Sequence, residues 1–213
     1  MKTLDVPQRS QQWYDARRGM VTCSRFDSIL TPKTEKPASA QWSLINELIA
    51  ESILPPEQGV IRGMTAEMEQ GVILEAEARC SYELEYASAP VKEVGFVIHS
   101  SGLFGGSPDA LVGETSGVEI KCPAGPTHIG YIREGVLPSE YRCQVHGYLI
   151  VTGRKQWDFF SYCRNLPPFK LTVSRDSFTD KLEAELFNFV QRYDAERVKF
   201  GLPALAKINQ LAR

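Results

Sequence analysis

Hydrophobic residues recur at helical spacing through most of the N-terminal part of the chain. Their spacing predicts an amphipathic helix over residues 40–54, which a Pro-Pro pair ends. We expect this stripe of the helix to be buried: Trp42, Ile45, Leu48, Ile49 and Ile53. Two short helices are predicted before it, over 10–30, the second opening at Thr22 or Ser24, and a longer helix after it, over about 65–86.

The pattern then changes to alternating and β-branched residues, which are typical of strands. Three such runs, 93–100, 103–113 and 116–123, are separated by Gly and Ser residues and predict a small antiparallel meander. The remaining chain predicts these elements: helices over 126–134 and 138–151, strands over 155–163 and 169–174, and a final amphipathic helix over 177–200. This mixture predicts an α/β (α+β) fold.

The composition is that of an ordinary globular protein: 213 residues, 43% hydrophobic and 23% charged. Disordered, collagen-like and coiled-coil classes are therefore excluded, and we expect one domain over residues 1–213. The formal net charge of -2 gives no overall attraction to polyanions. A nucleic-acid surface on this chain would have to be local.

The cysteines and the N-terminus predict a cytoplasmic protein. The five cysteines are widely spaced and include no C-x-x-C pair of the kind that binds zinc or performs redox chemistry. The first residues lack the apolar stretch of a signal peptide, and no aliphatic run is long enough to span a membrane. We therefore expect reduced thiols and no membrane association.

The candidate chemistry lies in the predicted meander, in a P-D…E-x-K arrangement. Pro108-Asp109 is followed on the next predicted strand by Glu119-Ile120-Lys121. Because side chains alternate along a strand, Glu119 and Lys121 share one face. If the neighbouring strand places Asp109 opposite them, two carboxylates and the Ile120 carbonyl offer the oxygen ligands that Mg²⁺ prefers.

Such a site suits the hydrolysis of a phosphodiester. The reaction needs a nucleophilic hydroxide and neutralised charge on the phosphate, both of which metal ions supply, while Lys121 orients the water and helps to deprotonate it. The motif by itself is short, and solvated surface charge on a hairpin is the alternative interpretation.

Residues on the predicted helices could complete this site. Glu75, in the middle of the 65–86 helix, could join the metal shell directly or through water. Gln144 and Tyr148 lie on one face of the 138–151 helix, where they could hold a phosphate or the attacking water, or make buried structural hydrogen bonds.

The N-terminal segment offers a second anion site. Arg17 or Arg18, together with Ser24 at a helix start, could form a phosphate pocket, since free backbone N–H groups at that position favour an anion. Taken alone, this segment favours the alternative interpretation, a solvated arginine cluster on a helix–turn–helix.

Several segments together resemble one family, the exonuclease of bacteriophage lambda and its viral-type recombinase (alkaline exonuclease) relatives, within the restriction-endonuclease-like PD-(D/E)xK nuclease superfamily. The resemblance covers nearly the whole chain except 31–64. It rests on these motifs in order: ARRGMVTCSRF, EQGVILEAEARCSYE, GGSPDALVG, GVEIKCP and EYRCQVHGYLIVTGRKQW. It implies a central mixed β-sheet flanked by helices, and 5′-to-3′ digestion of one strand of linear duplex DNA.

The resemblance also implies roles for single residues. Asp109, Glu119 and the Ile120 carbonyl match the family's metal ligands, Lys121 its catalytic lysine and Glu75 its helix acid. The residues that match the pocket for the 5′-terminal phosphate are Arg17, Ser24, Ser107 and Gln144. Arg17 is preferred to Arg18 because it keeps the family's spacing to Gly19.

The resemblance further implies Mg²⁺ as the cofactor, with Mn²⁺ as a substitute and two ions per site. It implies a homotrimeric ring around DNA and a single-strand annealing protein as partner, with the 3′ overhangs used in recombination. Two other hypotheses remain: an endonuclease with the same metal site, and a catalytically inert module that binds DNA ends.

Overall fold

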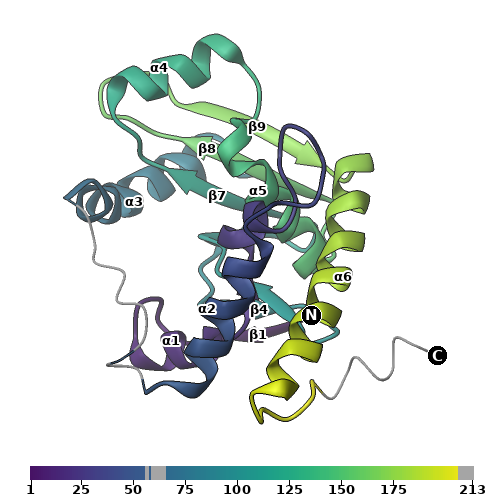
Figure 1. Cartoon of the computed structure of the whole chain (residues 1–213). Coiled ribbons are helices and arrows are strands. Elements are labelled where there is room, and N and C mark those ends of the chain that lie inside the picture. The colour runs from purple at the N-terminus through teal and green to yellow at the C-terminus, as the bar shows by residue number, and fades with distance from the viewer. Residues whose placement is uncertain (56–57, 59–65, 206–213) are drawn as a thin grey trace.

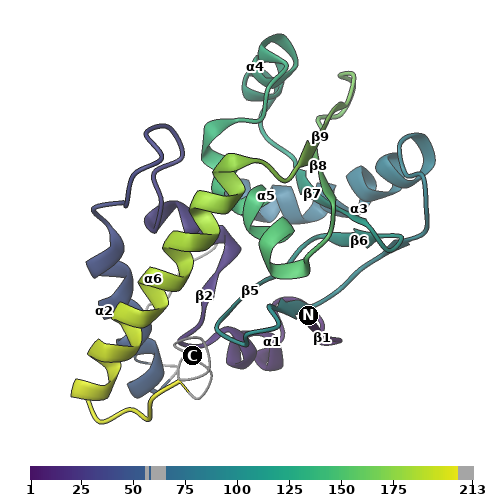
Figure 2. The same cartoon turned by 90° about the vertical axis from the view of Figure 1, so that its right-hand side faces the viewer.

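The structure is a computed structural model that describes residues 1–55, 58 and 66–205, with the backbone alone for 66–73. The elements, in chain order, are β1 (Lys2–Leu4), α1 (Gln11–Arg17), β2 (Val21–Thr22), the 3₁₀ helix η1 (Cys23–Ser28), α2 (Gln41–Ile53), α3 (Ala66–Glu85), β3 (Val91–Lys92), β4 (Phe96–Ile98), β5 (Phe104–Gly106), β6 (Ala110–Val112), β7 (Ser116–Lys121), α4 (Gly125–Glu134), α5 (Ser139–Thr152), β8 (Gln156–Ser161), β9 (Phe169–Ser174) and α6 (Ser177–Lys199). Figures 1 and 2 show them in two views.

The described strands form two mixed sheets rather than one. The larger has the order β3-β6-β7-β8-β9, with β7 and β8 parallel and the other pairs antiparallel. The smaller has the order β1-β4-β5-β2, with only the β2–β5 pair parallel. The mixed α/β fold class is thus confirmed.

The predicted meander is wrong in its connectivity. The run 103–113 is interrupted at Ser107-Pro108-Asp109, so β5 joins the smaller sheet and β6 the larger. Pro108 has no backbone N–H to donate to a ladder, which makes it unsuitable for the interior of a continuous strand. The turn that carries the P-D pair therefore connects the two sheets.

Helices cover both faces of the larger sheet. Alternate residues of β7 and β8 point to α3 on one face, where Val118, Ile120 and Phe160 pack with Ala78 and Tyr82. The other face packs against α5, which also contacts strands of the smaller sheet. Helix α5 therefore lies where the two sheets meet, while α6 and α2 lie side by side beyond it (Figure 2).

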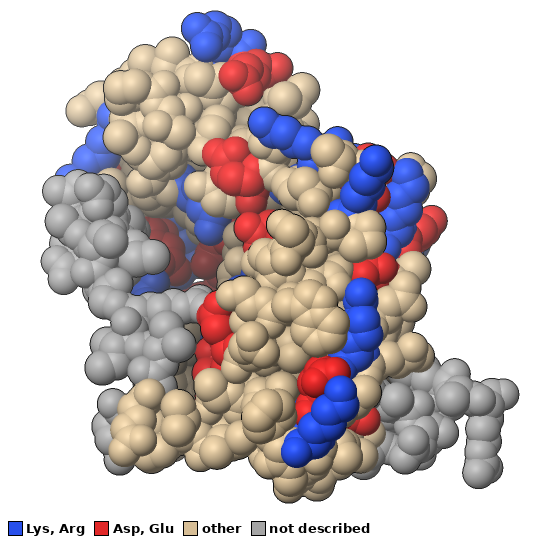
Figure 3. Space-filling view, in the orientation of Figure 1, with Lys and Arg blue, Asp and Glu red and all other residues tan. Residues whose placement is uncertain are grey.

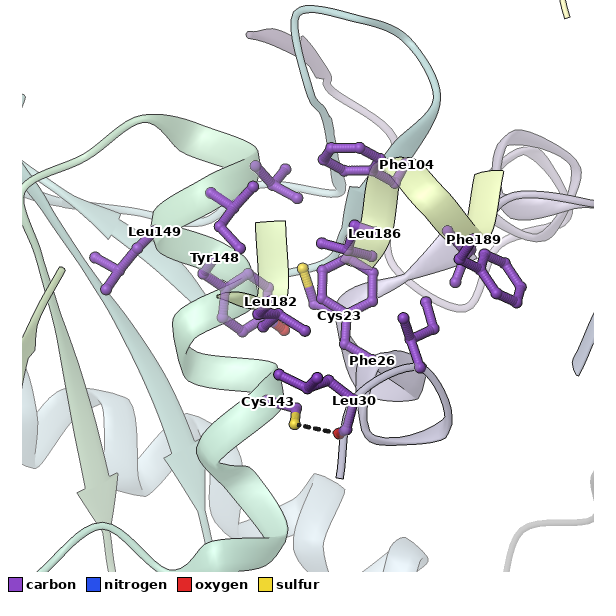
Figure 4. Packing of buried hydrophobic residues seen from close by; sticks show 14 of the residues in the cluster. Cys23, Phe26, Leu30, Phe104, Cys143, Tyr148, Leu149, Leu182, Leu186 and Phe189 are labelled. Atoms are coloured by element: carbon purple, nitrogen blue, oxygen red, sulfur yellow. Dashed lines mark hydrogen bonds between the residues drawn. The ribbon is translucent and has the colours of Figure 1, made fainter. Parts of the chain in front are cut away.

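The second N-terminal helix is a 3₁₀ helix that begins after Thr22 and packs closely against α5 and α6. Figure 4 shows Cys23 and Phe26 among Tyr148, Leu182 and Leu186. This approach depends on Gly147, since a Cβ there would lie 2.6 Å from the Phe26 ring. The close packing fixes η1, and the phosphate-pocket candidates beside it, against the helix that carries Gln144.

Helix α2 differs from its prediction in which residues it buries. Trp42 is 58% and Ile53 49% exposed, whereas Leu44 is buried. The buried side consists of Gln41, Leu44, Ile45, Leu48 and Ile49. These positions already complete an i, i+3, i+4, i+7, i+8 stripe, so Trp42 lies off it, and Ile53 is the last residue of the helix. Thr65, the predicted start of α3, lies outside the described residues.

Among the described residues, no helix combines the length and the apolar character that crossing a membrane requires.

Candidate active site

The turn Ser107-Pro108-Asp109 is the centre of the candidate site. It connects the two sheets and contacts α5. The face of the molecule in Figure 3 is hollowed, with acidic and basic side chains in and around the hollow. Tyr148 on α5 donates a hydrogen bond of 3.0 Å from its hydroxyl to the Ser107 carbonyl. The turn is therefore held from the α5 side.

Asp109 lies just before the first residue of β6 that pairs with β7. The β6–β7 ladder begins at Ala110, opposite Val118, so beyond it the Ile120 N–H donates to Asp109 Oδ2 at 2.5 Å instead. Burial raises the pKa of Asp109 well above its ordinary value, and the Glu119 carboxylate raises it further. The two predicted metal-ligand carboxylates thus share a buried, electrostatically strained site.

Glu119 is buried, and its neighbours contact only one of its oxygens. Lys121 Nζ and Gln144 Nε2 each donate to Glu119 Oε1 at 2.6 Å. Burial alone lowers the pKa of Lys121, but the charges of Glu119 and Asp109 outweigh it and the pKa is raised. Lys121 is therefore an ammonium group that faces the carboxylates, and Glu119 and Lys121 share a strand face as predicted.

The carboxylate pair fits a hard divalent cation. Glu119 Oε2 is buried and has no hydrogen-bond partner among the described residues. A buried carboxylate oxygen without a donor is costly, and a cation would satisfy it while relieving the repulsion between Asp109 and Glu119. The residues that would hold the ion are Asp109, Glu119 and, through its carbonyl, Ile120.

Glu75 does not join this pair directly. No group of three or more His, Cys, Asp or Glu side chains with metal-binding geometry exists within the described chain. Helix α3 covers the sheet face that bears Ile120, whereas Glu119 points to the α5 face. Glu75 accepts from Arg9 Nη2 at 3.2 Å, yet it is close enough for its charge to raise the pKa of Asp109.

The predicted phosphate-pocket residues lie next to the carboxylates. Arg17 Nη1 donates to Ser107 Oγ at 2.8 Å, and Arg17 Nη2 reaches Thr22 Oγ1 at 3.5 Å. Ser24 Oγ lies 3.4 Å from the same Thr22 hydroxyl. Arg17, Ser24 and Ser107 are therefore brought together, while Gln144 lies on the Glu119 side of the turn.

The Cys23 thiol precedes Ser24 on η1 and is buried. Burial, assisted by the Glu119 carboxylate, raises the pKa of the Cys23 thiol well above its ordinary value, and the Arg17 charge opposes this shift. The buried thiol thus responds both to the carboxylates and to the candidate phosphate pocket.

Arg18 points elsewhere. Its Nε donates to the Glu51 carbonyl on α2 at 2.5 Å, and Gly19 N donates to the Glu51 carboxylate. This placement agrees with the preference for Arg17 over Arg18 in the pocket.

Trp13 is a further candidate for this pocket, one that the sequence pattern did not single out. Its indole Nε1 donates to Ser107 Oγ at 2.8 Å and to the Gly95 carbonyl at 3.1 Å. The Arg17 guanidinium lies over its ring, 4.1 Å from the centroid. The i, i+4 spacing of Trp13 and Arg17 on α1 was the available signal.

The comparisons with known proteins agree on the family. The model of the YqaJ-like viral recombinase domain matches residues 12–155. Alkaline exonuclease LHK-Exo from Laribacter hongkongensis is 33% identical, with a TM-score of 0.78, and its structure in complex with dAMP is 35% identical, with a TM-score of 0.77. Both alignments cover 90% of this chain and 96% of that chain.

A third solved structure shows the fold alone. The phage related exonuclease from Haemophilus somnus 129PT is 15% identical, with a TM-score of 0.65 over 86% of this chain and 96% of that chain. No curated protein sequence matches the chain. The predicted resemblance, fold class and nuclease class are confirmed, and the chain belongs to the YqaJ-like viral recombinase family.

Proposed function

We propose that the protein is a metal-dependent 5′-to-3′ exonuclease that degrades the 5′-phosphorylated strand of linear double-stranded DNA. Its product would be a duplex with 3′ single-stranded overhangs, which serve recombination by strand annealing. Residues 1–213 act as one exonuclease domain in the cytoplasm. Membership of a viral recombinase family and the likeness to an alkaline exonuclease support this proposal.

The main support for the proposal is that one short turn, residues 107–109, contributes to both the candidate phosphate pocket and the candidate metal site. Ser107 accepts from Arg17 in the candidate phosphate pocket, and Asp109, two residues later, belongs to the carboxylate pair. A terminal phosphate on Arg17, Ser24 and Ser107 would be close to the metal site. An enzyme that cuts inside a duplex has no need for such a pocket.

Within the metal site, Mg²⁺, or Mn²⁺ in its place, would supply positive charge to the scissile phosphate and lower the pKa of the attacking water, with two ions per site. The oxygen ligands for these ions would come from Asp109, Glu119 and the Ile120 carbonyl. Glu75 would complete the acidic set from α3. Lys121 would orient the water with its ammonium group, and Gln144 would keep the Glu119 carboxylate in place.

Two features of the proposal concern assembly. We propose a homotrimeric ring that encloses DNA and a partner protein that anneals the single strands. The ring would reconcile a formal net charge of -2 with DNA binding, because basic side chains could line a channel while acidic ones face outward.

The test is digestion of linear duplex DNA whose two strands are labelled separately, with covalently closed circles as a second substrate. We expect Mg²⁺-dependent loss of the strand from its 5′ end, no cutting of circles, and no reaction in excess chelator. Circles cut as fast as linear DNA would favour the endonuclease hypothesis. Binding to ends without any cleavage would favour the inert module.

A further inference from the structure

Arg9 has a backbone conformation that residues with a side chain rarely adopt. Its φ is +69°, in the left-handed region that favours glycine. The residues on both sides hold it there: Gln8 donates from Nε2 to the Val94 and Pro108 carbonyls at 3.0 Å each, and Ser10 caps α1 by accepting from Trp13 N. A strained residue that its neighbours fix so firmly is a candidate for a functional role.

The segment that contains Arg9 is attached to the turn of the active site. The neighbouring residue, Gln8, donates a hydrogen bond to the carbonyl of Pro108, which directly precedes Asp109. The Arg9 guanidinium meets Glu75 on α3, and the contact uses one nitrogen, Nη2. The Arg9 side chain is 45% exposed, so its guanidinium is accessible from solvent beside Glu75.

The negative charge around the site favours a cationic side chain at the position of Arg9. Asp109 and Glu119 form a buried carboxylate pair, the Glu75 carboxylate is close enough to raise the pKa of Asp109, and any DNA strand that enters adds phosphates. Guanidinium groups bind carboxylates and phosphates with separate N–H donors, so one arginine can contact both at once.

Resting on the proposed function, we propose that Arg9 is a DNA-positioning residue: while Glu75 holds it, Arg9 binds a backbone phosphate of the strand beside the metal site. This contact is distinct from the terminal-phosphate pocket, which contains Arg17. Arg9 therefore contributes to the binding of any DNA end, with or without a 5′-phosphate.

The experiment measures equilibrium binding of short duplexes to the full-length protein in Ca²⁺ over a series of salt concentrations. The variants are Arg9→Gln and Arg9→Lys. The control is Arg175→Gln: Arg175 is also 45% exposed and pairs with the carboxylates Asp180 and Glu183, but it lies at the start of α6, away from α3 (Figure 1). Each duplex carries either a 5′-phosphate or a 5′-hydroxyl.

For Arg9→Gln we expect about tenfold weaker binding, as for one lost charge-assisted hydrogen bond, and a salt-dependence slope shallower by about one. The loss should be equal for both kinds of end. Arg9→Lys should keep the wild-type slope because it keeps the charge, and Arg175→Gln should match wild type. Thermal unfolding of all variants checks that Tm is unchanged. If Arg9 had a purely structural role, Tm would fall in Arg9→Gln.

Two results would overturn the inference: an unchanged slope in Arg9→Gln, or a loss confined to 5′-phosphorylated ends, which would place Arg9 in the terminal pocket. Failure of the proposed function looks different. In that case the wild-type protein itself would leave linear DNA undigested, or would cut closed circles as fast as linear DNA, whatever the Arg9 variants bind.

Discussion

Arg17 and Ser107, 90 residues apart in the sequence, are joined by a hydrogen bond of 2.8 Å from Nη1 to Oγ. The bond links α1 to the turn that also carries Asp109. Because the same serine hydroxyl accepts from the Trp13 indole, its orientation is fixed from two sides. A phosphate at this point would meet an arginine that is already oriented.

Replacing Arg17 should remove the preference for phosphorylated ends. We expect Arg17→Ala to slow digestion of 5′-phosphorylated duplex about 10- to 100-fold, because hydrogen bonds to charged groups contribute about 1.5–3 kcal/mol. Digestion of 5′-hydroxyl ends should change little. Arg18→Ala is the matched control, since Arg18 donates to α2 instead. Equal effects of the two changes on both substrates would contradict the assignment.

Replacing Lys121 should abolish cleavage while DNA ends remain bound. Lys121→Ala removes a cation beside the carboxylates without removing a metal ligand, so we expect a loss of at least about 10²-fold in kcat. Lys170→Ala is the control: both lysines have 26% exposed side chains, and Lys170 also pairs with a buried carboxylate, that of Asp158. Full activity of Lys121→Ala would remove Lys121 from the mechanism.

Asp109→Ala should lose both metal binding and turnover. The change removes a ligand and leaves the Ile120 N–H without the carboxylate that accepts its hydrogen bond. Calorimetric titration with Mg²⁺ and a digestion assay measure the two losses separately. Undiminished Mg²⁺-dependent activity would disprove the role of Asp109.

The site could be predicted from the sequence to a greater extent than the sheet connectivity. The faces of Glu119, Ile120 and Lys121 follow from strand alternation, a local property. The division of residues 103–113 between two sheets, by contrast, depends on which distant strands they pair with. The alternation of side chains along a strand is the same in either sheet, so it cannot indicate the division.

The burial of Leu44 instead of Trp42 agrees with the helical period, because Leu44, Ile45, Leu48 and Ile49 form one stripe along α2 and Trp42 lies off it. Long-range contacts could not be predicted in this way: the Arg9–Glu75 pair joins residues 66 positions apart through the tertiary fold.

The approach of η1 to α5 predicts a stability effect. Gly147→Ala would place a methyl group 2.6 Å from Phe26, and overpacking of this kind costs about 1–3 kcal/mol. At this chain length we expect Tm to fall by roughly 2–4 °C per kcal/mol. Gly130→Ala on α4 is the control, because its Cβ would meet nothing within 4 Å and should leave Tm unchanged or raise it. An unchanged Tm in Gly147→Ala would show that η1 can move away.

His146 predicts a loss of stability in mild acid. Burial lowers its pKa, an effect opposed by Asp176, 3.5 Å from Nδ1, and reinforced by Arg142. The unfolded state, with a histidine pKa of about 6.5, therefore binds more protons, and stability falls as pH drops below that value. Nδ1 also lies 2.8 Å from Thr179 Oγ1, a contact that Asn can imitate.

Urea unfolding of wild type and His146→Asn from pH 7.5 to 5.0 measures the effect. The difference between the two proteins isolates His146, because Asp109, whose raised pKa acts in the opposite direction, is present in both. Relative to the variant, wild type should lose stability toward pH 5. A variant with the same pH dependence as wild type would assign the titration to another group.

The most direct test of the account compares linear duplexes with 5′-phosphate and 5′-hydroxyl ends in a Mg²⁺-dependent digestion by the wild-type protein. If one turn joins a terminal-phosphate pocket to the metal site, the phosphorylated strand should be lost at least about tenfold faster, as one charge-assisted hydrogen bond predicts. Equal rates on the two ends would contradict that claim.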